Sequence, residues 1–142
     1  MVPSTKLLFA LAAGALAAAP AATAQPMSLP VDAEATAGGV PVACTGIGQT
    51  RLDPKWQAYG VRVEFSNARN EYLVGAAVTV HDKKGAEVLN VSCDAPWVLM
   101  KLPAGAYSIE GRILNSPAKP RSAPFSPPAK GQMRLVLQFP DA

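Results

Sequence analysis

The sequence predicts an all-β protein, built as a single β-sandwich of about seven strands with a short helical turn before the first core strand. Its central stretch, residues 78–113, alternates apolar and polar residues with a period of two, which is typical of half-buried strands. The alternating runs are Val78/Val80, Leu89/Val91/Cys93 and Tyr107/Ile109. Two turns, Asp82–Gly85 and Leu102–Gly105, separate these runs and contain the residues that tight turns favour. The length of 142 residues fits one domain.

Residues 1–24 are predicted to be a secretory signal peptide. Lys6 is followed by the apolar run LLFALAAGALAAAPAATA, and the small residues at its end predict cleavage between Ala24 and Gln25. The alternative is a retained transmembrane anchor, but the apolar run is short and Pro20 interrupts it. We therefore expect no membrane span after cleavage, and a periplasmic or secreted location.

The next two segments precede the predicted core. Residues 25–41 are rich in Ala, Gly and Pro without periodicity, which predicts a flexible N-terminal arm. Residues 42–142 are assigned to the β-sandwich domain. Within it, Asp53-Pro54 is typical of a helix start, so one or two helical turns are expected over Pro54–Tyr59.

Trp56 and Tyr59 lie on one face of this predicted turn. One interpretation is a plug whose aromatic rings cover an open end of the sandwich. The other is an exposed aromatic platform for a glycan or peptide. With Trp97, these residues form the possible binding surface that the sequence offers.

The remaining strands follow in order. Alternation and turn residues predict strands over 60–66, 72–81 with a kink at Gly75, 86–93, 97–102, 106–114 and 132–139. In the first of these, Arg62 and Glu64 are expected to face outward. The segment 115–131 contains five prolines and is predicted to be an extended connection that crosses from one sheet to the other.

The two cysteines, Cys44 and Cys93, are predicted to form a disulfide, because an exported chain meets an oxidising compartment and the count is even. Closing a loop of about fifty residues contributes roughly 4 kcal/mol in the chain-entropy model. Two free thiols and a metal pair are the alternatives. A metal pair needs further ligands, and His81 is the one histidine in the sequence.

The pattern Val78-x-Val80-x-Asp82-x-x-Gly85-x-x-Val88, followed by Leu102-Pro-x-Gly105-x-Tyr107-x-Ile109, resembles the carboxypeptidase regulatory-like domain. The resemblance covers about forty residues and implies a transthyretin-like (prealbumin-like) β-sandwich. Members of that family are usually non-catalytic accessory modules. The layout also resembles small exported bacterial proteins of that family with no assigned activity. Trp97 matches the aromatic residue that precedes the Leu-Pro-x-Gly turn, whereas the approach Cys93-Asp-Ala-Pro96 departs from the family pattern.

Chemical signatures are sparse. The formal net charge is +3 and the basic residues are scattered, so no nucleic-acid surface is predicted. The sequence contains no nucleophile elbow, phosphate loop or dinucleotide-binding pattern. We therefore expect no enzyme, no cofactor and no metal. Two functions remain: an exported non-catalytic module that binds a protein or cell-envelope partner, or an inhibitor or accessory subunit of a periplasmic cell-wall hydrolase.

Trp97 distinguishes a structural role from a binding role. Because it lies beside the predicted Leu102–Gly105 turn, we expect its ring to be mostly buried, packed near Tyr107 and the Cys44–Cys93 bridge.

Overall fold

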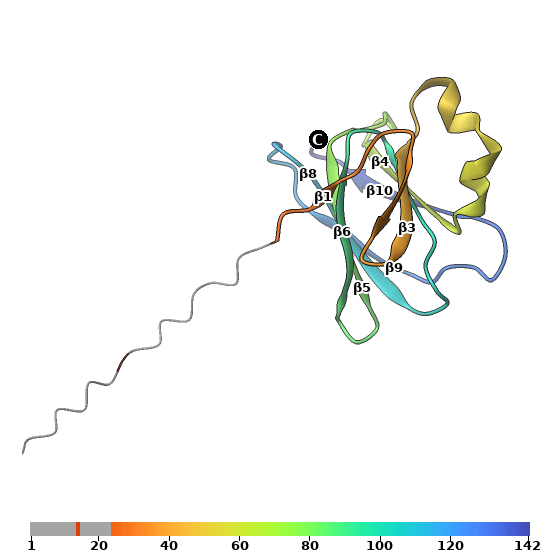
Figure 1. Cartoon of the computed structure of the whole chain (residues 1–142). Helices are drawn as coiled ribbons and strands as arrows, with labels where there is room; N and C mark the ends of the chain where they lie inside the picture. The colour runs from red at the N-terminus through yellow and green to blue at the C-terminus, as the bar shows by residue number, and fades with distance from the viewer. Residues whose placement is uncertain (1–13, 15–23) are drawn as a thin grey trace, which may run out of the picture.

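The computed structural model describes residue 14 and residues 24–142, and it shows two five-stranded sheets packed as a β-sandwich (Figure 1). Sheet A contains, in spatial order, β1 (Met27–Ser28), β6 (Glu87–Cys93), β5 (Ala76–Asp82), β8 (Tyr107–Ile113) and β9 (Arg121–Phe125). Sheet B contains β10 (Met133–Phe139), β4 (Val61–Asn67), β7 (Trp97–Met100), β3 (Val40–Thr45) and β2 (Glu34–Ala37). The all-β sandwich is confirmed, with ten strands rather than about seven.

Six strands form where alternation predicts them, namely β4, β5, β6, β7, β8 and β10. The hairpin between β5 and β6 shows why: the Asp82 carboxylate accepts hydrogen bonds from the backbone N–H groups of Lys84 (2.9 Å) and Ala86 (3.0 Å). Gly85 follows at φ 83°, a conformation that a residue without Cβ adopts at no steric cost. Strand β5 begins at Ala76 rather than at residue 72, because Gly75 at φ 77° breaks the extended chain.

The segment predicted to be a flexible arm, residues 25–41, instead contributes β1, β2 and the start of β3 to the two sheets. Strand β2 pairs with β3 in an antiparallel hairpin, and β1 pairs in parallel with β6. The proline-rich connection contains the edge strand β9 in sheet A. It then leads into β10 in sheet B, so the predicted crossing between sheets is confirmed.

The core lies between the sheets, where the inward side chains of both sheets are buried. The largest inward residues include Val63 and Phe65 of β4, Val78 of β5, Ile109 of β8 and Phe139 of β10. The predicted Cys44–Cys93 disulfide is present and joins β3 of sheet B to β6 of sheet A, with a Cα–Cα distance of 5.6 Å. The bond therefore ties the two layers together through the core.

Two short 3-10 helices, η1 (Gly48–Leu52) and η2 (Pro54–Ala58), form the predicted helical turn and are called the plug here. Asp53 caps η2, since its carboxylate accepts from the backbone N–H of Lys55 at 3.0 Å. The plug is the coiled segment that lies outside the two sheets in Figure 1. One interpretation of the sequence expected the plug to cover an open end of the sandwich, and this expectation was wrong.

The plug instead packs on the outer face of sheet B. Trp56 and Tyr59 form a small buried cluster there with Ala43 of β3 and Leu99 of β7. The Trp56 indole N–H donates to the Thr50 carbonyl at 2.7 Å, which fixes the ring within the plug.

Two further observations concern the membrane. Among the residues that the structure describes, no helix has the length and apolar character needed to cross a bilayer. Apart from Gly14 and Ala24, the predicted signal peptide lies outside the described residues.

Candidate functional site

The three aromatic residues that the sequence singled out are all buried: the exposed fraction is 2% for Trp56, 1% for Tyr59 and 9% for Trp97. They therefore do not form an exposed platform. The rings of Trp56 and Tyr59 face each other with centroids 6.1 Å apart, as their spacing predicted. Trp97 lies apart from them on the same outer face of sheet B, paired with Thr45 and Glu64 of the neighbouring strands.

Trp97 is buried as predicted, but its neighbours differ from the expectation. Its ring meets that of Tyr72 edge to face, at a centroid distance of 6.5 Å. Tyr107 stacks instead on Phe125, 5.6 Å away in sheet A. The reason is orientation, since Val98 of β7 faces the core and its neighbour Trp97 must face outward. The indole N–H of Trp97 is buried without a hydrogen-bond partner.

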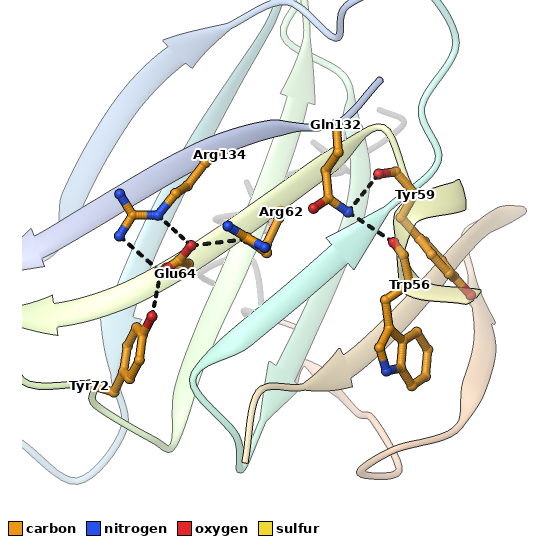
Figure 2. A network of polar contacts seen from close by, with 7 residues as sticks. All are labelled: Trp56, Tyr59, Arg62, Glu64, Tyr72, Gln132 and Arg134. Carbon is orange, nitrogen blue, oxygen red and sulfur yellow. Dashed lines mark hydrogen bonds and ion pairs between the residues drawn. The ribbon is translucent and has the colours of Figure 1, made fainter. Parts of the chain in front are cut away.

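Gln132 fixes the position of the plug beside this face. Its side-chain amide donates to the carbonyls of Trp56 and Tyr59, at 2.9 Å each (Figure 2). The Tyr59 hydroxyl donates to Glu34 Oε1 of β2 at 3.1 Å. Burial, together with this hydrogen bond and the charge of Glu34, raises the pKa of Tyr59 to about 12. These contacts hold the C-terminal end of the plug against the outer face of sheet B, where it covers Ala43 and Leu99.

The other half of this face is centred on Glu64, whose side chain is only 1% exposed. Arg134 of β10 donates from Nε to Glu64 Oε2 at 2.6 Å and from Nη2 to Oε1 at 3.2 Å. The Tyr72 hydroxyl donates to Oε1 at 2.9 Å. Figure 2 shows the carboxylate enclosed between these side chains and Arg62. We call these four residues the Glu64 cluster.

Arg62 completes the cluster. Its Nε lies 3.0 Å from Glu64 Oε2, which makes an ion pair whose angle falls outside hydrogen-bond geometry, so this buried N–H has no acceptor. The guanidinium carbon of Arg62 lies 4.5 Å from the centroid of the Trp97 ring. Arg62 is therefore held between an anion and an aromatic face, an arrangement to which its planar group is suited.

These donors determine the ionisation of Glu64. Burial alone raises the pKa of a carboxyl group, but here the hydrogen bonds from Arg134 and Tyr72, with the charges of Arg62 and Arg134, outweigh it. The pKa of Glu64 consequently lies below its ordinary value of 4.5. The same hydrogen bond raises the pKa of Arg134. At neutral pH the cluster contains two cations and one anion.

Beside the cluster lies a hollow of about 370 Å³, lined by Glu64, Ser66, Asn70, Tyr72, Arg134 and Val136. Its rim is partly apolar, since Tyr72 is 48% exposed and Val136 is 39% exposed. The Ser66 hydroxyl is buried at the hollow without a hydrogen-bond partner. The hollow thus combines a rigid charged floor with an aromatic and aliphatic rim.

Sequence reasoning placed Arg62 and Glu64 on the outward face of their strand, which is confirmed, but it missed their role. The alternating strand carries opposite charges two residues apart, and Arg134 occupies an outward position of the last strand. That pattern is the signal that was available. The sequence pattern does not show that β10 pairs in parallel with β4, and this pairing places Arg134 directly beside Arg62 on the neighbouring strand.

The Glu64 carboxylate is fully engaged by its neighbours. Both Glu64 oxygens already accept hydrogen bonds, and the lowered pKa leaves no proton on the carboxylate to transfer. In residue 14 and residues 24–142, no group of three or more His, Cys, Asp or Glu residues is positioned to hold a metal ion.

Comparison with protein-family models found no match, and comparison with curated proteins found none either.

Proposed function

We propose that this chain is an exported, non-catalytic β-sandwich module that binds a protein or cell-envelope partner through the hollow beside Glu64. The observation that carries the proposal is the composition of the rim, where Tyr72, Arg134 and Val136 lie together around a buried anchor. Tyrosine and arginine are among the residues enriched at binding hot spots, and fixed side chains lose less conformational entropy on association.

The rigidity of the rim supports this proposal. Arg134 is held by two hydrogen bonds to Glu64, and Tyr72 by one, so both present their outer atoms in a set position. Trp97 supports Tyr72 from below through its edge-to-face contact. Such preorganisation favours binding over side-chain rearrangement.

Export is supported by the disulfide, since such bonds persist in oxidising compartments. The resemblance to carboxypeptidase regulatory-like domains belongs to this proposal as well, because it implies an accessory module rather than an enzyme. The alternative role, an inhibitor or accessory subunit of a cell-wall hydrolase, differs in the identity of the partner.

Site-specific photocrosslinking tests the proposal. A photoreactive phenylalanine analogue replaces Tyr72 in the exported chain, and a matched control carries it at Leu52, which is exposed on the plug. We expect a partner adduct from position 72 and none from position 52, and Arg134→Gln should reduce its yield. An adduct with one hydrolase in stoichiometric amount would select the inhibitor role. Equal labelling from both positions, or none, would contradict the proposed binding surface.

A further inference from the structure

The edge of sheet B formed by β10 differs from the other sheet edges that the structure describes. Strand β10 has seven residues, MRLVLQF, without proline or lysine. Of the other edges, β1 has two residues, β2 has four, and β9 contains Pro124 and begins with Arg121. Short length, proline and charge are the features that protect an edge from pairing with another chain. Strand β10 is long and free of proline, and its one charged residue, Arg134, is paired with Glu64.

The direction of the backbone groups on β10 follows from its parallel pairing with β4. Met133 pairs with Val61 and its N–H donates to the Gly60 carbonyl at 2.9 Å. In a parallel ladder a residue points both its N–H and its C=O to the same neighbour, and the next residue points both away. Met133, Leu135, Leu137 and Phe139 therefore face β4. Arg134, Val136 and Gln138 present their backbone groups at the free edge.

We propose that this edge pairs with β10 of a second copy of the chain, antiparallel about a two-fold axis through Val136. The register brings Val136 opposite Val136 of the second copy, and Arg134 opposite its Gln138. In an antiparallel pair each such pair exchanges both backbone hydrogen bonds, so the three outward residues of each copy are all satisfied.

The side-chain pattern of β10 is self-complementary in this register. On the inner face, Leu135 meets Leu137 of the second copy, and Met133 meets its Phe139, so apolar residues oppose apolar residues. On the outer face, no like charges lie opposite each other. Arg134 faces the neutral side-chain amide of Gln138 in the second copy, and its own charge is paired with Glu64. Cross-strand pairs of this kind stabilise a sheet, whereas opposed like charges destabilise it. This charge pattern favours a second copy over an acidic or basic strand of another protein.

The pairing also extends the hollow. Arg134 and Val136 line it at the edge of the sheet, so the hollows of the two copies adjoin across the two-fold axis. The Gln138 amide of the second copy then lies beside Arg134. This inference goes beyond the proposed function and does not require it.

Charge-swap variants at Val136 test the pairing and its register. Val136 is 39% exposed on the outer face, so Val136→Lys and Val136→Glu are each expected to fold, as checked by near-ultraviolet circular dichroism. Each variant alone places like charges directly opposite each other, about 5.5 Å apart between Cα atoms. Sedimentation equilibrium should show a dimer for the disulfide-intact wild type and a dimer Kd at least about tenfold weaker for either variant. An equimolar mixture of the two variants should restore the dimer.

Leu52→Lys is the matched control, since it adds the same charge at an exposed position on the plug and should dimerise like the wild type. If Val136→Lys does not fold, Gln138→Arg replaces it, because it puts two arginines opposite each other. A wild type that stays monomeric up to millimolar concentration would overturn the proposal. So would two charge variants that dimerise as well as the wild type, or a mixture that fails to recover. Photocrosslinking from Tyr72 is unaffected by a monomeric result, so the two proposals fail separately.

Discussion

Replacing the buried Trp97 tests how the outer face of sheet B is stabilised. A buried tryptophan removes roughly 150–250 Å² from water, and its truncation to alanine typically costs about 3–5 kcal/mol. Two local terms modify this value. Trp97→Ala loses the contact with Arg62, about 0.5–1 kcal/mol, but it also removes an indole N–H that is buried without an acceptor. We expect a net cost of about 3 kcal/mol, at the lower end of the range.

Substitution by phenylalanine separates packing from hydrogen bonding. Trp97→Phe removes an unsatisfied donor, whereas Trp56→Phe, the matched control, breaks the 2.7 Å bond to the Thr50 carbonyl. The same chemical change should therefore cost more at Trp56, by about 1 kcal/mol, in urea denaturation. Trp97→Ala should lower Tm by on the order of 10–15 °C in calorimetry. An unchanged Tm for Trp97→Ala, or equal costs for the two phenylalanine variants, would refute this account.

Three further predictions rest on the structure and one on the sequence. Since the folded-state pKa of Glu64 is lowered, its contribution to stability is present above about pH 4.5 and lost as pH falls through the lower folded value; Glu64→Gln should abolish that part of the acid dependence of Tm. Tyrosinate absorbance should show one group titrating only near pH 12, and Tyr59→Phe should remove it. Gly105, at φ 152°, should tolerate valine poorly, costing about 1 kcal/mol or more in urea denaturation, whereas the exposed Lys83→Ala should change stability by less than about 0.5 kcal/mol. Intact-mass measurement of exported protein should give a chain beginning at Gln25.

The sequence predicts most strands whose apolar and polar residues alternate, and it misses strands that are very short, contain proline or do not alternate, namely β1, β2, β3 and β9. Strand β4 alternates because its outer side carries charges, so its register is readable from the sequence. Strand β3, VPVACT, is buried on nearly every residue because the plug covers its outer face. Without alternation, and with Pro41 near its start, it resembles a loop. Strand β9 contains Pro124, which is compatible with an edge position alone.

The site is predictable only in part, for a related reason. Strand β7 reads WVLM, four buried residues, so no polar position shows which side chain faces the core. The face of Trp97 is therefore undetermined by the pattern, and the expected contact with Tyr107 was wrong. Glu64 was placed correctly on the outer face, but its burial depends on Arg134, which lies 70 residues later in the chain. Local periodicity carries no information about such a partner.

The parallel pairing of β10 with β4 has a consequence for the order in which the chain folds. Sheet A gains its centre from the hairpin β5–β6 and from β8, which follow one another closely in the chain. Sheet B depends on β3–β7 and β4–β10, whose partners are further apart in the chain, and its edge strand β10 is the last strand of the chain. Distant pairings form late, because loop-closure entropy opposes them. We expect sheet A to form first, whereas the edge of β4 that pairs with β10 stays unpaired until the C-terminal strand is available. In a chain that crosses a membrane from its N-terminal end, sheet B would thus stay incomplete until the final residues have passed through.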